Sequence, residues 1–210
     1  MDCSLKRANH GEFMILKYLL LTLIVLAQIV PAFAQDEALD ELNPYDSNVE
    51  ETLRQIDEVY ERETGKSAFL EMSESKRECY RISCSVWIDV QKASQTARLY
   101  VDGVLRATWY VSTGTASYPT PNFDRHPNGR IYDAYSSRTY PGGDYNGLGN
   151  MPYAVFISGG FAIHGTARSN WARLGSPASH GCIRLHPDNG YAFNRLVRQY
   201  GIGDTWITVR

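Results

Sequence analysis

Side chains that can do covalent chemistry gather between His164 and Arg184. His164-Gly165 is followed, just before Arg184, by the run Ser179-His180-Gly181-Cys182. A thiol attacks a carbonyl as the thiolate, and its ordinary pKa of about 8.5 leaves it mostly protonated near neutral pH. Cys182 therefore needs an adjacent base, and two histidines, His164 and His180, are within reach in sequence. His164 lies at the end of a predicted strand, where a rigid scaffold can aim it. The pattern predicts thiol-dependent acyl transfer or hydrolysis.

The residues beside Cys182 could supply the rest of such a site. Gly181 allows a close backbone approach or a positive φ. The backbone amides of His180, Gly181 and Cys182 are then candidates for an oxyanion hole. The planar guanidinium of Arg184 suits a substrate carboxylate.

Two other interpretations of this cluster stay open. A lone buried cysteine is usually an inert core residue. The cluster could instead bind a metal ion, but its spacing matches no standard zinc pattern. The four candidate ligands are His164, His180, Cys182 and His186. We expect no metal and no cofactor.

Strands joined by tight turns are expected to position the cluster. Asp102-Gly103 and Gly159-Gly160 are predicted hairpin turns. Residues 113–150 are rich in Gly, Pro, Ser, Asn and Tyr, which predicts long loops with little regular structure. The predicted strands are Val86–Val90, Ala97–Val101, Val104–Val111, Tyr153–Ser158, Phe161–His164 and Thr205–Val209.

One clear helix follows the cluster. Pro187 suits a first helical position, and Gly201 is a stop signal after Tyr200. We find no internal repeat and no sign of a second domain. The sequence therefore predicts a strand-rich domain.

A second helix is predicted near the N-terminus. Ser47 and Glu50 have the spacing of a capping box, and Gly65 is a plausible end. An apolar stripe favours packing on the domain, or alternatively docking of a partner. The stripe consists of Val49, Leu53, Ile56 and Tyr60. Residues 35–46 are polar and acidic and are expected to form a mobile tail.

The first 34 residues have the pattern of a secretory signal peptide. Lys17 precedes the apolar run Tyr18–Val30. Its 13 residues are short for a membrane span, which needs about 20. Ala32 and Ala34 fit a small-residue cleavage site, with cleavage after Ala34. We expect export and no stable membrane span after cleavage; an uncleaved anchor is the alternative.

Cysteine spacing fits export. Nearby cysteines tend to pair in an oxidising compartment. Cys79 and Cys84 are close enough in sequence to pair across a turn. That pairing would leave Cys182 as the odd thiol of the mature chain, which marks it as a candidate reactive group.

The composition excludes other classes of protein. The chain has 210 residues, of which 43% are hydrophobic and 21% charged, as in a globular domain. A net charge of −2 argues against bulk binding to nucleic acid. Residues 35–78 carry a net charge of −9 and residues 79–210 one of +6. An acidic leader therefore precedes a basic domain.

His164-Gly165 together with Ser179–Arg184 resembles the signature of the L,D-transpeptidase catalytic domain (YkuD-like). The likeness covers roughly residues 85–210. It extends to Trp87–Val90, the Asp102-Gly103 hairpin, Val111–Gly114, Tyr118–Pro121 and Gly201–Val209. The predicted organisation is a signal peptide (1–34), an acidic tail and helix (35–84) and a catalytic domain (85–210).

The resemblance implies a fold, a location and a reaction. The fold would be mainly β with one or two helices, sandwich-like or barrel-like, around a cysteine-centred cleft. The protein would be a periplasmic enzyme of the cell envelope that acts on peptidoglycan stem peptides. The thiol would attack the carbonyl between the third-position diamino acid and the fourth-position D-alanine. D-Alanine would leave, and an amine of another stem peptide or of an envelope protein would resolve the thioester.

The resemblance also implies roles for single residues. Cys182 matches the nucleophile and His164 the general base. The backbone at His180 and Gly181 matches the oxyanion hole. Ser179 and Arg184 match signature positions that we assign to substrate binding. Hydrolysis by the same chemistry, as L,D-carboxypeptidase or amidase, and non-catalytic wall binding are the alternatives.

The region between Pro121 and Met151 departs from the family pattern. It is rich in Tyr and Arg and lacks the short Thr-Gly continuation that many members show. Its side chains either shape the substrate cleft or pack the loop on itself. The residues concerned are Tyr132, Tyr135, Arg138 and Tyr140.

Overall fold

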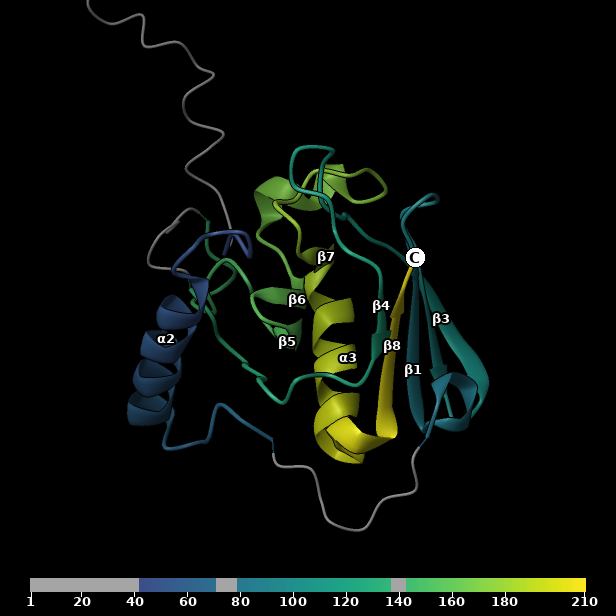
Figure 1. Ribbon diagram of the computed structural model, residues 1–210, viewed down its shortest axis with the longest axis horizontal. Helices are drawn as coiled ribbons and strands as arrows, with labels where there is room; N and C mark the ends of the chain where they lie inside the picture. Colours follow the sequence, from purple (N-terminus) through teal and green to yellow (C-terminus); the bar gives the residue numbers. More distant parts are fainter. Residues whose placement is uncertain (1–41, 71–78, 137–142) are drawn as a thin grey trace, which may run out of the picture. The chain divides into compact units, whose positions relative to one another are not determined.

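Two β-sheets form the framework in the computed structural model, which describes residues 42–70, 79–136 and 143–210 (Figure 1). The predicted signal peptide lies outside these residues. The larger sheet has the strand order β3-β2-β1-β8-β4, and the smaller one β5-β6-β7. The strands are β1 Val86–Gln91, β2 Thr96–Val101, β3 Val104–Tyr110, β4 Phe123–Arg125, β5 Val155–Ser158, β6 Phe161–Gly165, β7 Ile183–Leu185 and β8 Thr205–Val209.

Two α-helices are described, α2 (Val49–Thr64) and α3 (Pro187–Tyr200). The predicted mainly β fold with one or two helices is therefore confirmed. Short 3₁₀ turns lie at Arg81–Ser83, Arg168–Arg173 and Ile202–Asp204. Among the described residues, no helix combines the length and the apolar character that crossing a membrane requires.

Both predicted hairpins are confirmed. β2 and β3 pair antiparallel, and Asp102 and Gly103 between them have φ values of 49° and 75°. Two positive φ values in succession suit the right-handed twist of the flanking strands. β5 and β6 pair antiparallel around Gly159-Gly160. β8 then runs parallel to β1, so the end of the chain lies inside the larger sheet.

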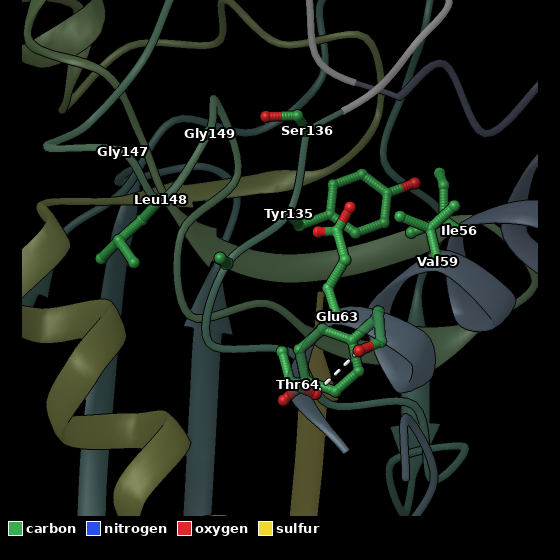
Figure 2. A pocket seen from close by; sticks show the side chains of 11 residues that line it. Ile56, Val59, Glu63, Thr64, Tyr135, Ser136, Gly147, Leu148 and Gly149 are labelled. Atoms are coloured by element: carbon green, nitrogen blue, oxygen red, sulfur yellow. Dashed lines mark hydrogen bonds between the residues drawn. The ribbon is translucent and has the colours of Figure 1, made fainter. Parts of the chain in front are cut away.

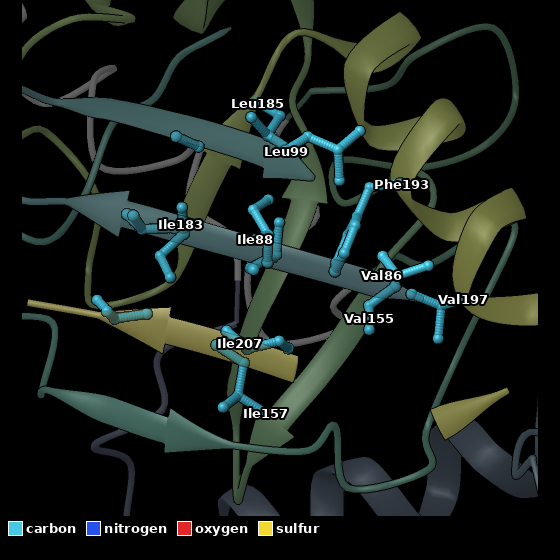
Figure 3. Packing of buried hydrophobic residues seen from close by; sticks show 14 of the residues in the cluster. Val86, Ile88, Leu99, Val155, Ile157, Ile183, Leu185, Phe193, Val197 and Ile207 are labelled. Atoms are coloured by element: carbon cyan, nitrogen blue, oxygen red, sulfur yellow. The ribbon is translucent and has the colours of Figure 1, made fainter. Parts of the chain in front are cut away.

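The two sheets share one hydrophobic core. Ile88 of β1 and Ile207 of β8 are fully buried on the larger sheet. Ile183 of the smaller sheet and Phe193 of α3 belong to the same cluster (Figure 3). Burial of a side chain of this size stabilises a fold by roughly 1.5–3 kcal/mol. This packing fixes β6 and β7 relative to the larger sheet.

The N-terminal helix ends as predicted but begins differently. Gly65 adopts the left-handed conformation at the C-terminus of α2, with φ 65°. Asn48 is the N-cap, and no side chain caps the helix, so the predicted capping box of Ser47 and Glu50 is wrong. The chain enters through a turn instead, in which the Val49 amide donates to the Asp46 carbonyl at 3.1 Å.

The apolar face of α2 packs on the domain. Leu53, Ile56 and Tyr60 are buried in a second hydrophobic cluster. The same cluster contains Cys182. Packing on the domain, rather than docking of a partner, therefore accounts for the stripe of α2.

The expected mobile tail is wrong for the part that the structure describes. Residues 35–41 lie outside the described residues. Leu42 and Pro44 are buried, and the segment leads directly into α2. Apolar side chains in an otherwise acidic stretch account for this burial.

Cys79 and Cys84 form the predicted disulfide, with their Cα atoms 4.9 Å apart. The turn between them is closed by the Cys84 amide, which donates to the Arg81 carbonyl at 2.9 Å. Cys182 is the one free cysteine among the described residues. This confirms the prediction that Cys79 and Cys84 pair with each other and leave Cys182 outside the disulfide.

Asp124 of β4 ties this disulfide turn to β8. Its carboxylate accepts hydrogen bonds from Arg81, Tyr80, Trp206 and Thr208 at 2.8–3.0 Å. The Arg81 hydrogen bond is the largest of the effects that hold the pKa of Asp124 below its usual range. A depressed carboxyl pKa contributes stability above the ordinary carboxyl range, and this stability is lost as pH falls through the folded-state pKa.

We expect Asp124→Asn to lower the free energy of unfolding at pH 7 by about 1 kcal/mol, because the variant loses charge-assisted hydrogen bonds. The effect stays small because 36% of the Asp124 side chain is exposed. The deficit should shrink at pH 3. Urea unfolding at both pH values measures it, with Glu58→Gln on the exposed face of α2 as control. An equal deficit at both pH values would contradict the role of the charge.

Candidate active site

Pairing of β6 with β7 brings His164 and Cys182 together. His164 lies opposite Arg184 in parallel register, and Cys182 immediately precedes β7. Strand spacing and rise place the Cα atoms of His164 and Cys182 on the order of 8 Å apart. Residues two apart on a strand face the same side, so the two side chains share one face. Both are buried, with exposed fractions of 0% and 1%.

The His164 ring is held in one tautomer. Its Nδ1 lies 2.6 Å from the carbonyl oxygen of Gly165. A carbonyl oxygen only accepts hydrogen bonds, so Nδ1 carries the proton and Nε2 of the neutral ring carries the lone pair. This is the form that a general base requires.

The Cys182 thiol faces two backbone carbonyls. Its Sγ lies 3.4 Å from the oxygen of Gly160 and 4.0 Å from that of Leu42. Both oxygens are hydrogen-bond acceptors and belong to the peptide backbone. Backbone from the turn before β6 and from the segment before α2 therefore surrounds the sulfur.

Two buried hydroxyls clamp the peptide that precedes Cys182. Ser179 Oγ accepts from the Gly181 amide at 3.1 Å and donates to the Cys182 carbonyl at 2.5 Å. Thr120 Oγ1 donates to the Gly181 carbonyl at 2.7 Å and accepts from the Gly114 amide at 2.8 Å. Gly181 has φ 117°, which favours glycine. The loop before the thiol is thus fixed from both sides.

This clamp redefines two of the predicted roles. Ser179, predicted to bind substrate, is fully buried beneath the loop and positions its backbone. The Gly181 amide already donates to Ser179. The amides of His180 and Cys182 are therefore the ones that we assign to an oxyanion.

Thr120 was not among the predicted site residues. Thr120 lies in Tyr118–Pro121, a segment that carries part of the family resemblance, but the carbonyl to which its hydroxyl donates belongs to Gly181, 61 residues along the chain. We expect Thr120→Val to slow acylation roughly 10–100-fold, because the backbone beside Cys182 loses a fixed position. Acylation rates from intact-protein mass spectrometry measure this. Thr120→Ser keeps the hydroxyl and should restore the rate; failure of this rescue would contradict a positioning role.

The side chain of Arg184 is buried, with only 2% of the residue exposed, and Nη1 donates to the Ala178 carbonyl at 2.7 Å. Its backbone exchanges two hydrogen bonds with Ser112 at 2.9 and 3.0 Å. The guanidinium is thus covered in this conformation, as the thiol is, and the contact with a substrate carboxylate stays a prediction. Arg184 braces the loop that carries the thiol.

The histidines outside the β6–β7 pair lie apart from each other. The His180 ring packs on Tyr118, with centroids 4.6 Å apart. His186 packs on Trp171 and caps α3. The structure therefore does not bring the four candidate metal ligands together. In the described ranges, the one group of three close ligand atoms is Cys79, Cys84 and Asp204, and its cysteines form the disulfide.

Two tyrosines of the 121–151 region, Tyr132 and Tyr135, pack in the protein's interior. Tyr132 donates its hydroxyl to Asp57 of α2, and Asp57 also binds Arg130 at 3.1 Å. Tyr135 is 2% exposed, and its hydroxyl finds no hydrogen-bond partner among the described residues. Burial, and next the nearby Cys182, raise the pKa of Tyr135, so its phenol stays protonated. Arg138 and Tyr140 lie outside the described residues.

Two surface cavities adjoin the site without containing the thiol. One, of about 330 Å³, lies between α2 and residues 134–136 and 147–149 (Figure 2). Ile56 and Glu63 line its helix side and Tyr135 its opposite side. The second, of about 270 Å³, lies beside Thr113–Thr115 and Thr120. Cys182 lines neither cavity. The thiol is therefore covered rather than open to these cavities.

Comparison with known proteins identifies a family for the chain. A family model, the L,D-transpeptidase catalytic domain (YkuD), matches residues 85–205. No curated protein matches the chain significantly. A solved L,D-transpeptidase from Mycobacterium smegmatis is 26% identical over 61% of this chain and 59% of that chain, with a TM-score of 0.49. One from Mycobacterium tuberculosis H37Rv is 23% identical over 61% and 58%, with a TM-score of 0.45. The chain spans about three fifths of the length of these two structures.

Proposed function

The chain belongs to the L,D-transpeptidase catalytic-domain family, and on that premise we propose that it is a cysteine-dependent acyltransferase of peptidoglycan stem peptides. One observation carries the proposal. His164 of β6 lies near Cys182, which immediately precedes β7, and Nδ1 of His164 contacts the Gly165 carbonyl, so Nε2 is the basic nitrogen of the neutral ring. A base in this tautomer near a thiol outside any disulfide is the minimum that nucleophilic catalysis requires.

Acylation is the first half of the proposed reaction. His164 Nε2 takes the thiol proton, and Sγ of Cys182 attacks the carbonyl between the third-position diamino acid and D-alanine. The amides of His180 and Cys182 hold the resulting oxyanion. The carbon–nitrogen bond then breaks, and His164 returns its proton to the amino group of the departing D-alanine. A thioester at Cys182 remains.

Transfer to an amine is the second half. An acceptor amine attacks the thioester carbonyl and gives a proton to His164. The carbon–sulfur bond breaks, and the thiol regains its proton from His164. We propose a stem-peptide diamino acid or an amine of an envelope protein as acceptor. We also propose export to the periplasm after cleavage behind Ala34, with residues 35–84 as a leader to the catalytic domain of residues 85–210.

Intact-protein mass spectrometry tests the proposal. The protein is mixed with a tetrapeptide muropeptide that ends in D-alanine, alongside the Cys182→Ala variant. We expect the wild type alone to gain the mass of the tetrapeptide minus D-alanine. Released D-alanine without an adduct, and without amide product when an amine is added, would indicate hydrolysis. Neither adduct nor product would overturn the proposed donor.

A further inference from the structure

The segment Leu42–Asp46, called the strap below, lies directly on the thiol. The Leu42 carbonyl oxygen is 4.0 Å from Cys182 Sγ. The Leu42 side chain is 2% exposed and belongs to the same hydrophobic cluster as Cys182. The strap thus contributes both an apolar side chain and a peptide carbonyl to the surroundings of the nucleophile.

Tyr45 fastens the strap across the loops on either side of the thiol. Its hydroxyl donates a hydrogen bond to the Pro119 carbonyl. Its ring meets Phe161 edge to face, with centroids 5.3 Å apart, and tilts against Tyr118 at 6.4 Å. Yet 46% of Tyr45 stays exposed. The fastening is therefore a surface contact rather than part of the core.

Two glycines let the strap come this close. A Cβ atom on Gly181 would lie 2.9 Å from Cγ of Pro44 and 3.3 Å from Cε2 of Tyr45. A Cβ atom on Gly160 would lie 2.9 Å from the Cα of Pro44. Separations below 3.0 Å are steric clashes, so a side chain at either position would push the strap away. The strap therefore fits closely against the backbone that flanks the thiol.

The strap and the carbonyl group of a substrate cannot both occupy the space beside Cys182 Sγ. Attack requires a substrate carbonyl carbon about 3–3.5 Å from sulfur. The thiol is 1% exposed with the strap in place, and the strap's own carbonyl faces it. An acyl donor that takes the place of the Leu42 carbonyl beside Cys182 therefore requires the strap to move.

The neighbouring helix is also held by contacts that do not involve the strap. Asp57 of α2 binds Arg130 at 3.1 Å and accepts from the Tyr132 hydroxyl. Leu53 and Tyr60 are buried in the second cluster. The turn at Asp46 and Ser47 can therefore act as a hinge, from which the strap leaves while α2 stays in place.

We propose that the strap is a built-in, displaceable cover of the active-site cysteine. It holds the enzyme closed by occupying the place of the acyl donor, and this identification of the displaced ligand rests on the function proposed above. A site closed in most molecules reacts in proportion to the fraction that is open. The strap therefore lowers both the reactivity of Cys182 and the rate of acylation.

Alkylation of Cys182 by iodoacetamide tests the cover without requiring any substrate. Peptide mass mapping of the full chain separates Cys182 from Cys3. We expect Tyr45→Ala and Leu42→Asp to alkylate at Cys182 at least roughly 10-fold faster than the wild type. Tyr45→Phe, which loses only the hydroxyl, should give a smaller rise. Ser47→Ala, which changes an exposed side chain beside the hinge, should match the wild type.

A second readout separates this inference from the proposed function. The thermal midpoint of Tyr45→Ala should stay near that of the wild type, which excludes unfolding as the cause of faster alkylation. Faster alkylation with faster acylation by the tetrapeptide supports both proposals. Faster alkylation with no acylation of any variant supports the strap as a cover of Cys182 and overturns the tetrapeptide as the acyl donor. Equal alkylation of Tyr45→Ala and wild type overturns the cover, whether or not acylation occurs.

Discussion

Replacing Cys182 by Ser is expected to abolish detectable acyl-enzyme formation, with a loss of at least roughly 10³-fold in rate. A hydroxyl is far harder to deprotonate than a thiol near neutral pH, so His164 cannot activate it to the same degree. Rates of D-alanine release and intact-protein mass measure the effect.

The serine variant should keep the fold. Its hydroxyl can donate to the Gly160 carbonyl, which the thiol now faces at 3.4 Å. An unchanged thermal midpoint would show that the loss is chemical. Undiminished turnover would remove Cys182 from the role of nucleophile and return the family signature to a binding role.

Replacing His164 by Asn is expected to slow acylation by roughly 10²–10⁴-fold, the contribution of a positioned general base. The asparagine amide can still donate to the Gly165 carbonyl, as Nδ1 of His164 does at 2.6 Å. The variant therefore removes the basic nitrogen with little change in the local hydrogen bonding. The measurement is the acylation rate as a function of pH. The rise in rate that accompanies deprotonation of the base in the wild type should be absent in the variant.

His180→Asn is the matched control for the histidine experiment. His180 is half-buried and packs on Tyr118, whereas His164 is fully buried on β6. The control should lose far less activity than His164→Asn. A loss below tenfold for His164→Asn together with a large loss for His180→Asn would transfer the role of base to His180.

Local signals in the sequence predicted most of the regular structure. The helix Pro187–Tyr200 was bounded by proline at its start and glycine after its end, both of which act through their own backbone. The hairpin at Asp102-Gly103 was visible for the same reason. The strands β4 and β7 were missed, because three residues are too few to show an alternating pattern.

The sequence by itself also indicated the family and the proposed chemistry. It supplied the candidate thiol, the candidate base and the disulfide between Cys79 and Cys84, since all of these depend on residue types and short spacings. The motif alone suggested that the proposed nucleophile and base are neighbours. The pairing of β6 with β7 explains how the fold brings these two residues close together.

Tertiary structure alone decided how that chemistry is held and covered. Ser179 and Arg184 carry polar groups that suit a substrate. Folding buries both side chains, and each donates a hydrogen bond to a backbone carbonyl of the loop. Thr120 became a clamp because its two partners, Gly114 and Gly181, meet only in the folded chain. The acidic stretch before α2 was predicted to be mobile from its composition, yet Leu42 lies against Cys182, 140 residues away in sequence. Contacts over such separations depend on the packing of the whole domain, which no local pattern records.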